Sequence, residues 1–196
     1  LDVQESGIEV HLNTVVTKEM LEEIKPDALI VAIGSSPFVL PIEGSERAIV
    51  AHDVLSEKVQ VPGDNVVIIG GGLVGFETAE FLAARQKKVT VLEMKEKALQ
   101  DLGPLRQITA QFAMAQMPIT IETSTTVERI EDHVVVASGK KYPYDSVIMA
   151  VGSKANDTSM YANLGIPTYI VGDCKKAGVA LDAFKDAYHA VLEINK

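Results

Sequence analysis

The 196-residue chain has one cysteine, Cys174, and no tryptophan. A single cysteine excludes an internal disulfide, a CxxC redox pair and a cysteine-ligated cluster carried by this chain alone. The four histidines are scattered and lack the spacing of metal ligands; they are His11, His52, His133 and His189. We therefore expect no metal site among these residues.

Long apolar runs and an excess of positive charge are also missing. One of the longest apolar runs, residues 28–33, is far shorter than the ~20 residues that span a bilayer, and the first residues lack the basic start of a signal peptide. The 18 basic residues are outnumbered by 27 acidic ones, and the net charge of -9 opposes binding to nucleic acid or anionic lipid. The composition predicts a cytoplasmic protein with neither nucleic acid nor a membrane as partner, and it leaves the oligomeric state open.

A glycine motif is the strongest local signal. Residues 66–75 read VVIIGGGLVG, an apolar run that breaks into GxGxxG, and Glu93 closes the next apolar run, VTVLE. In such a motif the first glycine allows a tight turn, the second lets the backbone approach a pyrophosphate, and the third lets the following helix pack on its strand. The predicted phosphate-binding residues are Gly70, Gly71, Gly72, Leu73, Val74 and Gly75. The alternative is a tight turn between a strand and a helix that binds nothing.

An internal repeat indicates two related units. Residues 27–35 read DALIVAIGS and residues 145–153 read DSVIMAVGS, and both are apolar runs that end at a glycine, as expected for buried parallel strands. The alternative is that buried strands look alike by chance. Only the second unit contains a glycine-rich turn, because the residues before the first copy hold a single glycine, Gly7. We therefore expect the chain to be a piece of a longer polypeptide.

Periodicity and turn residues predict an α/β fold with a parallel sheet and a β-meander in place of one crossover helix. The predicted strands are 66–70, 89–93, 119–122, 126–131, 133–137 and 169–173, and residues 142–151 lead into the strand of the second repeat copy. The predicted helices are 73–84, 104–116 and 179–195. We divide the chain into residues 1–60, 61–152 and 153–196, of which the first and last belong to one domain.

With these pieces in place, the chain resembles the flavoproteins that carry two dinucleotide-binding domains, in which an NAD(P)H domain is inserted into an FAD domain. More closely, it resembles the reductase half of the 2,4-dienoyl-CoA reductase, 2-enoate reductase and trimethylamine dehydrogenase group. The segments that carry the resemblance are VAIGSSP (31–37), VVIIGGGLVGFETAEFL (66–82), VIMAVGS (147–153) and YIVGDCKKAGVALDAFKDAYHA (169–190). The resemblance implies a Rossmann-like NAD(P)H-binding domain within a partial FAD-binding domain.

The resemblance also implies roles for individual residues, although no catalytic residue can be named. Residues 70–75 hold the NAD(P)H pyrophosphate, Glu93 binds the adenine-ribose hydroxyls, and Glu77 lies near the nicotinamide. The implied FAD-side residues are Ala32, Gly34, Gly172 and Asp173, and Gly152 of the second repeat copy is a further cofactor-binding residue. Without the resemblance, Glu77 would be an ordinary solvated charge and Asp173 a loop cap.

The implied function is transfer of electrons from NADH through FAD to an upstream barrel. That barrel would hold FMN and a four-iron cluster and reduce an activated alkene or a similar small acceptor. Glu93 favours NADH because a carboxylate repels the 2′-phosphate of NADPH, although Lys95 and Lys97 soften this repulsion. Three alternatives stay open: a nucleotide-binding module without hydride transfer, a decayed structural domain, and a disulfide reductase of the glutathione-reductase type. The thioredoxin-reductase type is excluded, because it carries its CxxC in the nucleotide domain.

Overall fold

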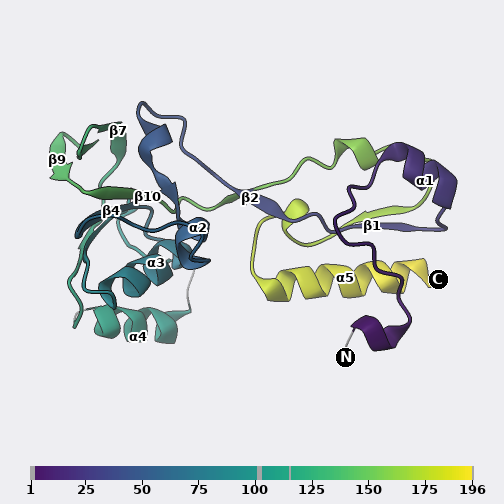
Figure 1. Ribbon diagram of the computed structural model, residues 1–196. Coiled ribbons are helices and arrows are strands. Elements are labelled where there is room, and N and C mark those ends of the chain that lie inside the picture. Colours follow the sequence, from purple (N-terminus) through teal and green to yellow (C-terminus); the bar gives the residue numbers. More distant parts are fainter. Residues whose placement is uncertain (1–2, 101–102, 115, 196) are drawn as a thin grey trace. The chain divides into compact units, whose positions relative to one another are not determined.

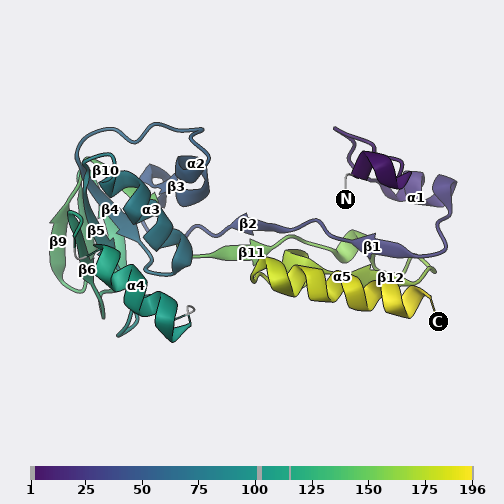
Figure 2. The ribbon, with the colours of Figure 1, turned by 90° about the horizontal axis from the view of Figure 1, so that it is seen from below.

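The computed structural model describes residues 3–100, 103–114 and 116–195 and divides the chain into two compact units (Figures 1 and 2). One unit consists of Leu1–Ser35 and Ala155–Lys196, and the other of Ser36–Lys154. We call them the terminal unit and the central unit. Residues 36–60, which the sequence analysis grouped with residues 1–35, belong to the central unit, because β3 (Ile49–Val50) pairs with β10 (Ser146–Met149).

A five-stranded parallel sheet forms the middle of the central unit. Its strand order is β3-β10-β4-β5-β6, with β4 at Asn65–Ile69, β5 at Lys88–Leu92 and β6 at Ile119–Glu122. The apolar residues Val66–Ile69 of β4 are all buried. Both faces of the sheet must therefore be covered, as is usual for parallel strands.

Helices cover one face of this sheet and a β-meander covers the other (Figure 1). Ile68 and Ile148 pack with Leu82 of a helix, whereas the alternate residues Val67 and Val147 pack against the meander. The helices are α2 (Ala51–Leu55), α3 (Leu73–Ala83) and α4 (Pro104–Met114), and the meander strands are β7 (Val127–Glu131), β8 (Val134–Ala137) and β9 (Lys140–Pro143). A short 3-10 helix, η2 (Ser45–Arg47), precedes β3.

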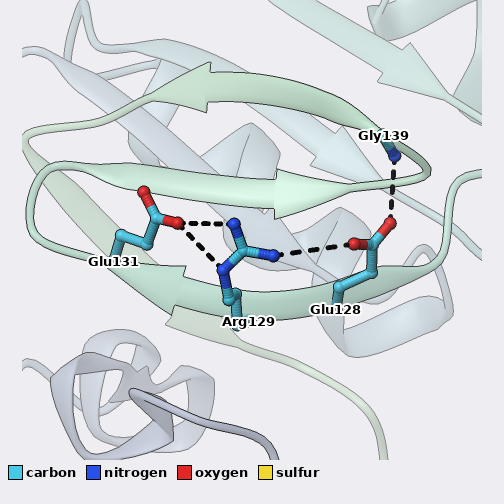
Figure 3. Close-up of polar contacts among 4 residues, drawn as sticks. All are labelled: Glu128, Arg129, Glu131 and Gly139. Carbon is cyan, nitrogen blue, oxygen red and sulfur yellow. Dashed lines mark hydrogen bonds and ion pairs between the residues drawn. The ribbon is translucent and has the colours of Figure 1, made fainter.

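A polar network ties β7 to the turn between β8 and β9 (Figure 3). The Arg129 guanidinium pairs with Glu131 at 2.6 Å and with Glu128 at 3.8 Å, and the Gly139 N–H donates to Glu128 at 3.0 Å. The three charged side chains are more than a third exposed, so each ion pair contributes only about 0–1 kcal/mol. The network therefore orients the meander and adds little to its stability.

The carboxylate of Asp145 fastens the entry of β10 to the start of β4. Its Oδ2 atom accepts hydrogen bonds from the N–H groups of Asn65 at 2.8 Å and Asp64 at 2.9 Å. These backbone hydrogen bonds favour the ionised form and hold the pKa of Asp145 below its ordinary value.

Asp145→Asn should lower the free energy of unfolding at neutral pH and make it less sensitive to acid. Because the folded-state pKa is depressed, the stabilisation is present above the unfolded-state pKa and is lost as the pH falls through the folded-state pKa. Asparagine does not titrate in this range, so the variant and the wild type should converge in acid. Urea unfolding at several pH values measures this difference, and curves that stay parallel would contradict it.

A short parallel strand pair organises the terminal unit. β1 (Leu29–Val31) pairs with β12 (Thr168–Ile170), and Figure 1 shows α5 (Ala180–Ile194) alongside this pair on the side away from α1 (Lys18–Ile24). The small core of the unit contains Leu21, Val31, Tyr161 and Cys174. The described part of the unit also contains the 3-10 helices η1 (Val3–Ser6), η3 (Ser159–Tyr161) and η4 (Gly172–Cys174).

The structure confirms that the two repeated segments are built alike. Each forms a parallel strand, β1 or β10, and then passes through a glycine with positive φ, Gly34 (+71°) or Gly152 (+93°). Each glycine leads into a strand of a second pair, in which β2 (Ser35–Pro37) is hydrogen-bonded to β11 (Ser153–Ala155). The repeat is therefore structural as well as sequential.

The predicted α/β class, parallel sheet and meander are confirmed, and most predicted elements end within one or two residues of the observed ones. The predicted strand 169–173 ends earlier, at Ile170, because Gly172 takes a φ of +65° and begins η4. Residue 115 of the predicted helix 104–116 lies outside the described residues. Within the described ranges, no helix is long and apolar enough to cross a membrane.

Candidate functional site

The glycine loop between β4 and α3 has no room for side chains at two of its positions. Gly70 has a φ of +108°, and a Cβ atom there would lie 2.4 Å from the carbonyl oxygen of Ala150. A Cβ atom on Gly75 would lie 2.0 Å from the carbonyl oxygen of Gly70. Both obstacles are backbone atoms that cannot swing away, so the loop requires glycine at these positions. The turn and the close helix packing that the motif predicts are present.

α3 begins directly after this loop, and the backbone N–H groups of its first turn can bind a ligand. The helix begins at Leu73 after the N-cap Gly72, and no side chain among the described residues caps it there. The first N–H groups of an α-helix have no partner within the helix, and together with the helix dipole they attract anions. Leu73 and Val74 supply two of these groups. The loop can therefore hold a negatively charged phosphate through backbone donors.

Glu93 lies directly against the glycine loop, although its side chain is only 7% exposed. Its Oε2 atom accepts a hydrogen bond from the Gly71 N–H at 2.6 Å, and its Oε1 atom accepts one from the Lys95 N–H at 2.8 Å. Each carboxylate oxygen has two acceptor sites, so these bonds leave capacity for ligand hydroxyls. The structure thus brings Glu93 to the glycine loop, whereas Glu77, also predicted to be near the nucleotide, is an exposed residue of α3.

The four residues predicted to lie near FAD come together in the terminal unit. Ala32 and Gly34 follow β1, and Gly172 and Asp173 follow β12, so all four lie at the carboxyl end of this parallel pair. Asp173 Oδ1 accepts a hydrogen bond from the Gly178 N–H at 3.2 Å. Its Oδ2 accepts one at 3.1 Å from the hydroxyl of Ser35, which sequence analysis did not single out although it directly follows Gly34.

The segment after β12 is also tied to α5. Asp186 of α5 accepts hydrogen bonds from the Lys175 ammonium group at 2.5 Å and from the Gly172 N–H at 3.2 Å. The bond from Lys175 is the main cause that holds the pKa of Asp186 below its ordinary value. Gly152, the remaining predicted residue, lies in the central unit, where its carbonyl oxygen accepts a hydrogen bond from the Phe38 N–H at 2.9 Å.

A parallel sheet with a glycine loop after one strand and an acidic residue after the next defines the fold of dinucleotide-binding proteins. The chain belongs to the pyridine nucleotide-disulphide oxidoreductase family, whose model matches residues 2–178. Membership of this family implies binding of FAD and a pyridine nucleotide.

Individual relatives agree with this assignment. The chain is 33% identical to a cinnamate reductase from Clostridium sporogenes and 31% identical to an NADH oxidase from Thermoanaerobacter brockii. Each comparison covers 98% of this chain but only 30% and 32% of the respective relative. A solved 2-naphthoyl-CoA reductase complex superposes with a TM-score of 0.85 at 32% identity, over 96% of this chain and 30% of that protein. The chain therefore corresponds to about a third of these relatives.

Proposed function

We propose that this chain is the NADH- and FAD-binding part of a longer flavin oxidoreductase. The relatives include a cinnamate reductase and an NADH oxidase, and the chain matches about a third of each. The remaining part of the polypeptide would hold FMN and a four-iron cluster and would reduce an activated alkene or a similar small acceptor. A cytoplasmic location stays a prediction from the sequence.

The observation that carries this proposal is the glycine loop. Backbone atoms fill the space that side chains would need at Gly70 and Gly75, and the uncapped start of α3 faces the same loop. The residues present therefore fit a diphosphate, which the N–H groups of Leu73 and Val74 would hold. When bound, the nicotinamide supplies a hydride and FAD accepts it.

Glu93 supports NADH as the preferred nucleotide. Two backbone N–H groups hold its carboxylate in place, and its side chain is buried. A carboxylate at the end of this strand accepts hydrogen bonds from ribose hydroxyls but repels a 2′-phosphate. Lys95 and Lys97 are exposed, so their charges are screened by solvent and offset this repulsion only weakly.

On the FAD side, the proposed ligands are the residues at the carboxyl end of β1 and β12. Asp173 would accept hydrogen bonds from the flavin's ribityl hydroxyls, and α5 would direct the positive end of its dipole toward the flavin. Phe184 and Tyr188 of α5 are 74% and 64% exposed, which is unusual for large apolar and aromatic side chains. This exposure supports the proposal that further polypeptide packs on the terminal unit and completes the FAD site.

Stopped-flow reduction of the intact protein tests the function. NADH should bleach the visible absorbance of the flavin in a rapid phase, and dithionite should bleach it to the same extent as a control for a competent flavin. Bleaching by dithionite but by neither NADH nor NADPH would contradict hydride transfer and favour the nucleotide-binding module. A disulfide reductase would need cysteines elsewhere, because Cys174 is buried and its thiol donates to the carbonyl oxygens of Val31 and Val171.

A further inference from the structure

Residues 94–100, which we call the strap, follow β5 and return to the glycine loop. The strap is fixed near its start, where the Lys95 N–H donates to Glu93 and the Lys95 carbonyl oxygen accepts from Ser124 at 2.9 Å. It is fixed again near its end, where the Leu99 N–H donates to the carbonyl oxygen of Gly71 at 2.9 Å. Between these points, residues 96–98 border a cleft beside β6.

The two peptide groups that flank the Cα atom of Gly71 are therefore both held. Glu93 binds the N–H of Gly71, and Leu99 binds its carbonyl oxygen. That carbonyl belongs to the same planar trans peptide as the N–H of Gly72, so the two groups point in opposite directions. By fixing the carbonyl, Leu99 fixes the direction of the Gly72 N–H at the N-cap of α3.

Leu99 is held in a costly conformation to make this bond. Its φ of +57° lies in the left-handed region, which is unfavourable for a residue with a side chain. Its side chain is only 2% exposed and packs in one cluster with Phe76 of α3 and Met114 of α4. Such a conformation persists when its surroundings over-determine it, and it is enriched at ligand-binding sites.

Gln107 of α4 provides the last link of this chain of contacts. Its Nε2 atom donates to the carbonyl oxygen of Leu99 at 2.9 Å. The side chain of Gln107 thus holds the carbonyl group of Leu99, and the N–H of Leu99 holds the Gly71–Gly72 peptide.

We propose that Gln107 and Leu99 are positioning residues for nucleotide binding, because together they aim the Gly72 N–H at the diphosphate. This inference rests on the proposed function of the glycine loop. It predicts that a residue of α4 tunes nucleotide affinity through the strap.

Gln107→Leu should weaken NADH binding to this chain about fivefold, the effect of losing the hydrogen bond from the Gly72 N–H to the diphosphate once that N–H is misdirected. Gln107→Glu is a second variant of similar size, which cannot donate to the Leu99 carbonyl oxygen when ionised. Gln116→Leu makes the same replacement at an exposed residue beyond α4 and should leave the affinity unchanged. Calorimetric titration measures the Kd of each variant at a temperature well below its Tm.

The resonance of the Gly72 amide in nucleotide-free protein separates positioning from a general loss of stability. It should shift in both Gln107 variants and stay in place in Gln116→Leu. An unchanged Kd in the Gln107 variants, or a raised Kd without a shift of the Gly72 resonance, would overturn the positioning role. The proposed function would still stand in that case, provided that the wild-type chain binds NADH. If the wild-type chain binds neither NADH nor NADPH, both proposals are wrong.

Discussion

Gly70→Ala should abolish nicotinamide nucleotide binding and destabilise the central unit. The new Cβ atom would meet the carbonyl oxygen of Ala150 at 2.4 Å, so the end of β10 or the loop itself must move. Overpacking of this kind costs about 1–3 kcal/mol. The φ of +108° adds backbone strain, because alanine rarely adopts it. The same displacement would misdirect the N–H groups at the start of α3.

Gly139→Ala is the matched control for this variant. Gly139 also has a positive φ, +73°, but nothing lies within 4 Å of the position its Cβ would occupy. Gly139→Ala therefore introduces backbone strain without a steric clash. We expect Gly139→Ala to lower the Tm slightly and to bind NADH as the wild type does. Thermal unfolding and calorimetric titration of both variants test this. Wild-type NADH affinity in Gly70→Ala would contradict the proposal that the glycine loop binds the diphosphate.

The sequence was most informative where a local pattern determines structure. Continuous apolar runs predicted the buried parallel strands, and the glycine spacing predicted the turn into α3. β3 was not predicted, because it is only two residues long and exists through its pairing with β10. α1 was also missed, although Thr17 is a recognisable N-cap whose side chain accepts a hydrogen bond from the Met20 N–H.

At the candidate site, the sequence indicated that Glu93 would lie beside the glycine loop but not which atoms would be in contact. The distance of Glu93 from the glycine motif along the chain indicated that they would meet, yet the hydrogen bond from the Gly71 N–H depends on the pairing of β4 with β5. The left-handed conformation of Leu99 has no sequence signal, because tertiary packing rather than a glycine or asparagine imposes it. The hydrogen bond between Ser35 and Asp173 joins residues 138 positions apart, which no local pattern reveals.

Glu93→Gln should weaken NADH binding about tenfold or more and reduce the preference for NADH over NADPH. The substitution keeps the size of the side chain but offers one acceptor oxygen to two backbone N–H groups, those of Gly71 and Lys95. One of them then faces an NH₂ group, and an unpaired buried donor costs about 1–3 kcal/mol. The loss of negative charge also removes the repulsion of a 2′-phosphate, so the affinity for NADPH should fall less than that for NADH.

Glu96→Gln removes the same charge three residues further along the chain, from an exposed side chain of the strap. Because its carboxylate does not bind the Gly71 N–H, this variant should keep the wild-type ratio of the NADH and NADPH dissociation constants. Parallel calorimetric titrations with both nucleotides give this ratio for the wild type and the two variants. Tighter binding of NADPH than NADH to the wild type, or an unchanged ratio in Glu93→Gln, would mean that Glu93 does not select the nucleotide and that its carboxylate only braces the glycine loop.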